Sequence, residues 1–160
     1  ELAWFGDIKW WDWHRQELLA SGIPIATCCE NVKLQQELGG GDRARIRFFN
    51  RDGDHRFGLT TRTGPFVSWN RSSGGAAISL CHRLGARTIV LLGFDMRRVE
   101  GEKNWHQDHK EPRHVNPFRR HLTPFPHIAE DAAALGISIL NATPGSAIHQ
   151  FPFVNLEDLL

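Results

Sequence analysis

Residues 67–96, VSWNRSSGGAAISLCHRLGARTIVLLGFDM, carry the pattern that decides the predicted fold. We predict a short strand over residues 66–69, a polar Gly-rich turn over 70–75 and a small-residue helix over 76–84 that stops at a glycine. The apolar run 88–92 has no polar alternation, which indicates a parallel strand covered on both faces. A strand, a helix and a strand of these lengths indicate a right-handed βαβ unit.

Polar residues follow both strands of this unit, at the end where ligands of open α/β sheets bind. The first turn offers hydroxyl groups, amide groups at a helix start and Arg71, which together suit a phosphate or a carboxylate. After the second strand, Phe94 offers an aromatic face for a base, and Asp95 offers a carboxylate for ribose hydroxyls or a metal. We expect a third polar turn, residues 141–146, to face the same pocket.

The flanking segments extend the alternation of strands and helices. We predict strands over residues 2–5, 23–28, 45–49 and 137–140, helices over 9–20 and 128–135, and a turn over 50–54. Together they predict one Rossmann-like, three-layer α/β domain over residues 1–160, with a mainly parallel sheet. Such domains usually open with a strand and a Gly-rich phosphate loop. Either that opening is missing before Glu1, or the central turn alone forms the phosphate site.

Composition narrows the class of protein. The net charge of +1 and the pI of about 8.1 give no general electrostatic reason to bind nucleic acid. Three cysteines, two of them adjacent, argue against a disulfide scaffold and fit a reducing compartment. The sequence shows no apolar run of membrane-spanning length and no signal peptide, so we expect a cytoplasmic protein without a membrane partner.

Three tryptophans, at positions 10, 11 and 13, exceed what one face of the first helix can bury. We favour a thick core with one exposed ring. The alternative is a stacking wall for a base or a sugar.

The segment from 96 to 126 is rich in Arg, His and Pro and lacks apolar periodicity, which predicts a long His/Arg-rich binding loop after the Gly-x-Asp strand. His106 and His109 in it are candidate general bases, because the imidazole pKa lies near neutrality. These histidines and Asp108 could also join Asp95 around a metal. That ligand pattern is weak, so we predict no metal site and leave a divalent cation open as a cofactor.

The order of these motifs resembles two groups of known proteins. A Ser-Ser-Gly turn at 72–74, an apolar strand ending in Gly-Phe-Asp at 93–95, a His-rich loop and the turn at 141–146 resemble a phage protein family, sometimes labelled norphogenetic, that is related to 6-hydroxymethylpterin pyrophosphokinase-like domains. The same order is similar to bacterial sialyltransferases that use CMP-sialic acid. The resemblance covers about residues 67–154.

This resemblance implies roles for individual residues. It implies a nucleotide held by the turn residues Asn70, Arg71, Ser72, Ser73 and Gly74, by Phe94 and Asp95 at its base and ribose, and by Asn141, Thr143 and Ser146 along the cleft. It also makes His106 or His109 the base. The opening Gly-Pro-Ser phosphate loop of these proteins, expected upstream of Glu1, is absent from this chain.

Three functions follow as hypotheses. The first is a transferase that moves a glycosyl or diphosphate group from a nucleotide-activated donor to a hydroxyl acceptor, with a loop histidine as base. The second is a non-catalytic phage module that captures a nucleotide or nucleotide-derived signal in the host cytoplasm. A structural role in a virion is the third, and it leaves the clustered polar strand ends without a reason.

Overall fold

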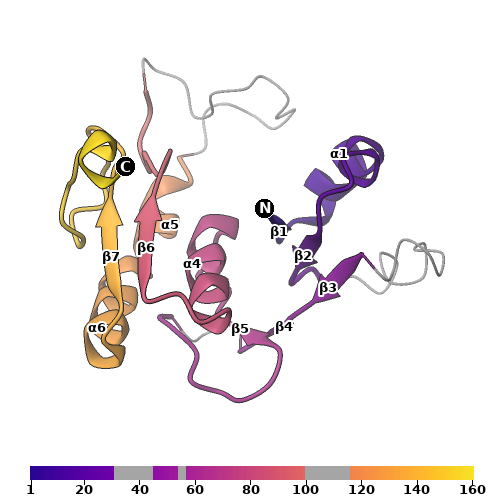
Figure 1. Cartoon of the computed structure of the whole chain (residues 1–160), viewed down its shortest axis with the longest axis horizontal. Coiled ribbons are helices and arrows are strands. Elements are labelled where there is room, and N and C mark those ends of the chain that lie inside the picture. The colour runs from indigo at the N-terminus through magenta and orange to yellow at the C-terminus, as the bar shows by residue number, and fades with distance from the viewer. Residues whose placement is uncertain (31–44, 54–56, 100–115) are drawn as a thin grey trace.

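The computed structural model describes residues 1–30, 45–53, 57–99 and 116–160. Short strands alternate there with helices, and the pairings between the strands are parallel (Figure 1). The strands are β1 (Ala3–Phe5), β2 (Ile25–Thr27), β3 (Ile46–Phe48), β4 (Asn50–Arg51), β5 (Phe66–Val67), β6 (Thr88–Leu91) and β7 (Ser138–Asn141). The helices are α1 (Ile8–Ala20), α4 (Ser73–Arg83), α5 (Phe118–Leu122), α6 (Phe125–Leu135) and the 3-10 helix η1 (Leu156–Leu159).

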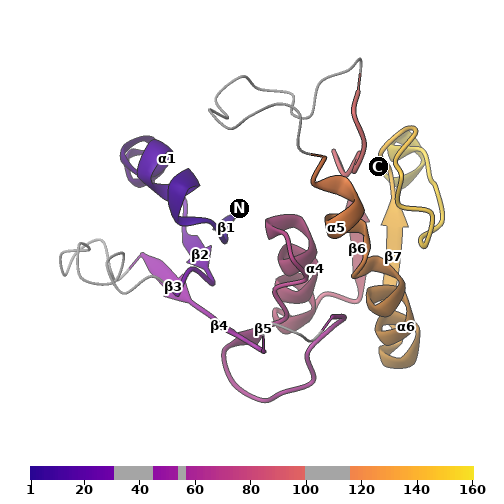
Figure 2. The same ribbon diagram turned by 180° about the vertical axis from the view of Figure 1, so that it is seen from behind.

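The strands form three small sheets, ordered β1-β2-β3, β4-β5 and β6-β7. One extended segment joins the first two sheets, because the Phe49 amide donates to the Thr27 carbonyl oxygen at 2.8 Å and the next amide, of Asn50, donates to Pro65 at 2.7 Å. Within the described residues β5 and β6 do not pair, and α4 lies between the two groups of strands in both Figure 1 and Figure 2. The fold is therefore mixed α/β with short parallel strands in small sheets.

Helix α4 connects the two groups of strands through its core residues. The Ser72 hydroxyl accepts a hydrogen bond of 3.0 Å from the Gly75 amide, and this cap starts the helix three residues before the predicted position. Ile78 packs into the core of β6, β7 and α6, whereas Leu80 packs with Ala26 beneath β2. After the helix, Gly85 has a φ of 89°, the left-handed conformation predicted there.

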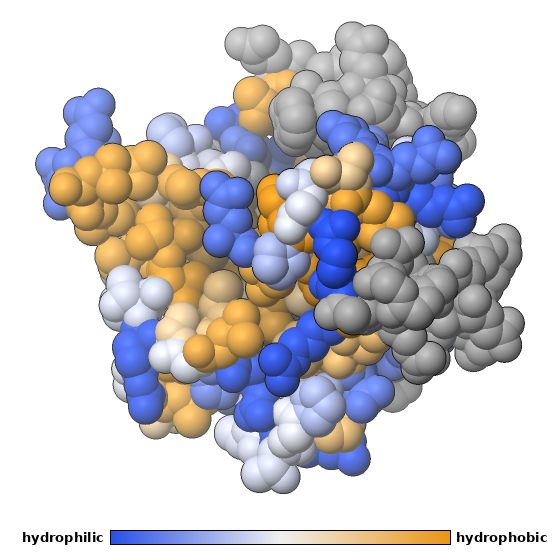
Figure 3. Space-filling model, turned by 45° about the vertical axis from the view of Figure 1, so that its right-hand side comes forward, coloured by the Kyte–Doolittle hydropathy of each residue, from blue (hydrophilic) through white to orange (hydrophobic). Residues whose placement is uncertain are grey.

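The prediction that β6 is covered on both faces is wrong for the described residues. Ile89 and Leu91 are buried against α6, but Val90 is 37% exposed and Leu92 is 53% exposed. Alternate side chains point to opposite faces of a strand, and the described helices cover one of these faces. Apolar side chains, drawn in orange, also reach the surface of the face shown in Figure 3.

Two further predictions are corrected. Asn50 and Arg51 form β4 instead of a turn, because their backbone pairs with β5 in parallel register. The predicted loop over 96–126 contains helix α5 and the start of α6, while its residues 100–115 lie outside the described part. Helix α6 ends as predicted at Gly136, which has a φ of 65°. Among the described residues, no helix has both the length and the apolar character needed to cross a bilayer.

Candidate functional site

The structure brings the three predicted polar turns together. The Phe94 amide donates to the Thr143 hydroxyl at 3.0 Å, and the Ser146 hydroxyl donates to the Phe94 carbonyl oxygen. On the other side, the Phe94 ring lies against Gly74, where a Cβ atom would approach Cε1 to 3.0 Å. The turns after β5, β6 and β7 are therefore neighbours at one end of the strands.

Three residues of the last turn that are predicted ligand contacts have hydrogen-bond partners within the protein. Asn141, Thr143 and Ser146 are all buried. The Asn141 side chain donates to Ile148 at 3.1 Å and accepts from the Thr143 amide at 3.0 Å. These side chains hold the turn in shape, and they do not line the pocket described next.

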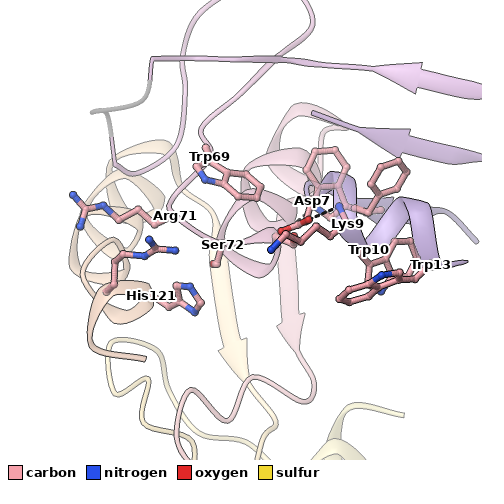
Figure 4. Close-up of a pocket in the computed structure, with 12 residues that line it drawn as sticks. Asp7, Lys9, Trp10, Trp13, Trp69, Arg71, Ser72 and His121 are labelled. Carbon is pink, nitrogen blue, oxygen red and sulfur yellow. Dashed lines mark hydrogen bonds between the residues drawn. The ribbon is translucent and has the colours of Figure 1, made fainter. Parts of the chain in front are cut away.

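A pocket of about 340 Å³ lies at the carboxyl end of β1, between the amino ends of α1 and α4 (Figure 4). This is the end of a parallel α/β arrangement at which ligands bind. The lining residues come from β1, α1, α4, α5 and the segments next to them: Trp4, Phe5, Asp7, Lys9, Trp10, Trp13, Trp69, Arg71, Ser72, Ser73, Arg120 and His121.

The turn before α4 presents Arg71 to the pocket. Asn70 and Arg71 both have left-handed backbones, with φ angles of 52° and 57°. Two consecutive residues of this kind are costly, so contacts elsewhere must hold the turn. The buried Asn70 side chain does so: it accepts from the Gly58 amide at 2.9 Å and donates to the carbonyl oxygens of Gly58 and Gly75. Asn70, a predicted nucleotide contact, thus has its side chain engaged within the turn.

Helix α4 points its amino end at this pocket. Ser72 and Ser73 lie there, and the first amide groups of a helix lack partners inside the helix. These groups and the helix dipole favour an anion. Arg71 and Arg120 line the same pocket, from the turn before α4 and from α5. The lining residues include three cationic side chains, Arg71, Arg120 and Lys9, and one carboxylate, Asp7.

His121 brings an imidazole to the pocket from α5. Burial lowers the pKa of His121, and the positive charge of Arg120 lowers it further. The ring is therefore neutral at pH 7, the form that can accept a proton.

Aromatic side chains form the opposite wall. Trp11 is buried in the core, while Trp10 and Trp13 line the pocket, the latter 39% exposed. Trp10 stacks on Phe5 with ring centres 5.6 Å apart. The first helix therefore supplies both a core tryptophan and an aromatic wall, and Figure 4 shows Trp10 and Trp13 side by side.

No protein-family model matches this chain, and no significant match was found among the curated proteins or the solved structures. The two resemblances drawn from the motifs therefore stay predictions, and the site is interpreted from its own chemistry.

The remaining predicted site residues divide into three groups. Arg71, Ser72 and Ser73 line the pocket, and Gly74 follows them in the first turn of α4. Phe94 and Asp95 lie on the adjacent turn and are not among the lining residues. The predicted bases, His106 and His109, lie outside the described residues, as does Asp108. In the described ranges, no group of three or more His, Cys, Asp or Glu side chains could hold a metal.

Sequence reasoning missed several lining residues. Trp69 directly precedes the predicted turn, and Asp7 directly follows the glycine that ends the first strand, so both positions carried a usable signal. Arg120 and His121 lie in a segment without periodicity, and only the fold of α5 brings them to the pocket.

Proposed function

We propose that this pocket binds a nucleotide or a nucleotide-activated sugar, and that the chain is a transferase. It would move a glycosyl or diphosphate group to a hydroxyl acceptor. We also propose that the small sheets belong to one Rossmann-like, three-layer domain, and that the protein acts in the cytoplasm. The observation that carries the proposal is the meeting of Arg71, Arg120 and the amino end of α4 in a pocket walled by indole rings.

The cationic side of the pocket suits phosphate. Arginine guanidinium groups bind phosphate oxygens through two parallel hydrogen bonds, and helix amide groups add further donors. Arg71, Arg120 and the first turn of α4 would together hold the phosphates. The same groups would stabilise the negative charge on a departing phosphate, which is the main electrostatic requirement of group transfer from a nucleotide.

The aromatic side of the pocket suits a planar ring. Trp13, the more exposed of the two lining tryptophans of α1, offers an indole ring for a base, and Trp10 packs beside it against Phe5 and His14. Trp69 stands across the pocket near Ser72 (Figure 4). The Asp7 carboxylate lines the same pocket and accepts from the Lys9 amide through one oxygen, so its other oxygen would accept a hydrogen bond from a ribose hydroxyl. Phe94 and Asp95 on the neighbouring turn stay proposed contacts for a ligand that extends past Gly74.

A general base completes a transferase. His121 is the histidine of the described residues that lines the pocket, and its lowered pKa keeps it neutral. His106 and His109 remain predicted bases, outside the described residues. If all three can be replaced without loss of turnover while the ligand still binds, capture of a nucleotide is the function instead.

A thermal-shift panel tests the proposal. Nucleoside diphosphates and nucleotide sugars at about 100 times Kd should stabilise the fold by about 2.7 kcal/mol and raise the melting temperature. R120A should abolish that rise, whereas R119A, which changes an exposed neighbour outside the pocket, should keep it. The proposal fails if no nucleotide in the panel raises the melting temperature, or if the two variants behave alike.

A further inference from the structure

A partly buried guanidinium group lies next to the pocket-lining residue Trp69. Arg51, in β4, donates from Nε to the Cys28 carbonyl oxygen at 3.0 Å and from Nη2 to the Gly6 carbonyl oxygen at 2.9 Å. These two oxygens lie just past the ends of β2 and β1. The Arg51 Cζ atom also stands 4.1 Å from the ring centre of Trp69. One side chain therefore connects two strand ends to an indole that lines the pocket.

A second contact fixes the same indole ring. A Cβ atom placed on Gly6 would lie 2.1 Å from Cζ3 of Trp69 and 2.6 Å from Cη2. The ring can occupy its position only because residue 6 has no side chain. Gly6 and Arg51 thus confine Trp69, and the hydrogen bond between Arg51 and Gly6 couples the two.

This confinement matters because Trp69 lies in an irregular segment. It follows β5 and directly precedes the left-handed residues Asn70 and Arg71. A side chain that must become ordered when a ligand binds lowers the affinity, by up to about tenfold. A ring held in place before binding avoids that cost. Arginine suits this task better than lysine, since its planar group can stack on a ring and donate two hydrogen bonds at once.

We infer that Arg51 is a positioning residue, which holds Trp69 as a preformed wall of the pocket without lining the pocket itself. The identity of the ligand that contacts Trp69 rests on the proposed nucleotide function. The positioning of Trp69 by Arg51 does not depend on that function, so two separate experiments test the two claims.

The first experiment needs no ligand. In protein labelled with 5-fluorotryptophan, W69F identifies the fluorine NMR signal of Trp69. In R51M this signal should move or broaden, while the signals of Trp10 and Trp13 stay in place. The matched control is R47M, which removes an exposed arginine from the neighbouring strand β3. An unchanged Trp69 signal in R51M overturns the inference. If R51M does not fold, R51K replaces it under the same criterion, because lysine keeps the charge and loses the planar fork.

The second experiment is a double-mutant cycle on nucleoside diphosphate affinity. R51M and W69L should each weaken binding, by up to about tenfold. If Arg51 acts through Trp69, the double variant should bind no worse than W69L alone. Losses that multiply overturn the inference. Absence of nucleotide binding in the unmodified protein would remove the proposed function, and the NMR result would still decide whether Arg51 positions Trp69.

Discussion

The indole Nε1 of Trp4 donates a hydrogen bond of 2.9 Å to the carbonyl oxygen of Ser73. Trp4 lies in β1 and Ser73 is the first residue of α4, 69 positions further along the chain. Both residues line the pocket. This bond therefore ties one wall of the pocket to the helix end that would receive the phosphate.

Removing the hydrogen bond between Trp4 and Ser73 should destabilise the packing of β1 against α4. W4F keeps an aromatic ring but leaves the partly buried Ser73 carbonyl oxygen without its indole donor. We expect a loss of about 1–2 kcal/mol in the free energy of unfolding, measured by urea denaturation. W13F, at a more exposed tryptophan of the same pocket, should change it by about 0.5 kcal/mol or less. Equal effects of the two substitutions would contradict the role of the bond.

Gly58 supports the turn that presents Arg71. Its backbone bonds the Asn70 side chain, its φ is 99°, and an added Cβ atom would lie 2.1 Å from the Asp131 carboxylate. G58A should destabilise the protein by about 3 kcal/mol or more, from backbone strain and a clash together. G22A is the matched control, because its φ of 76° is also left-handed but nothing lies within 4 Å. It should cost about 1 kcal/mol. Similar losses in both variants would show that the clash does not matter.

His121 should titrate below its ordinary range. Burial is the larger cause of its lowered pKa, and the charge of Arg120 is the second. We therefore expect R120A to raise the pKa of His121 part of the way towards about 6.5, the value of a free imidazole. R119A should leave it unchanged. An NMR titration of the His121 ring proton measures this, and equal pKa values in all three proteins would contradict the arrangement of α5.

Cys28 should make the free energy of unfolding depend on pH in the alkaline range. Burial raises the pKa of this thiol to about 11, although nearby Arg51 acts in the opposite direction. In the unfolded chain the thiol ionises near pH 9.0, the ordinary value from which burial raises it. Between these two values the folded state binds more protons, so the free energy of unfolding falls as the pH rises. C28A should remove a part of that fall of about 3 kcal/mol. Urea denaturation at a series of pH values measures this. If the free energy of unfolding falls equally with pH in the unmodified protein and in C28A, this pKa is contradicted.

The sequence was informative where local chemistry decides the structure. Gly85 and Gly136 take left-handed conformations directly after their predicted helices, because the end of a helix is decided over a few residues. The neighbouring position of the polar turns also followed from parallel strands ending on one side.

Long-range contacts set the parts that could not be predicted. Arg51 has the local signals of a turn, and its strand forms only because β5 pairs with it. Val90 belongs to an apolar run, and only the arrangement of the helices leaves it exposed. Likewise the burial of Asn141, Thr143 and Ser146 could not be predicted, because their hydrogen-bond partners lie up to 52 positions away.

Calorimetric titration tests most directly whether one side of the pocket binds the phosphates of a nucleotide and the other side binds its base. A nucleoside diphosphate and its parent nucleoside would be titrated into the unmodified protein, into R71A/R120A and into W13A. We expect the arginine double variant to bind the diphosphate no better than the nucleoside, and W13A to weaken both ligands. If the diphosphate binds R71A/R120A as tightly as it binds the unmodified protein, the pocket does not hold the phosphate and the proposed function is contradicted.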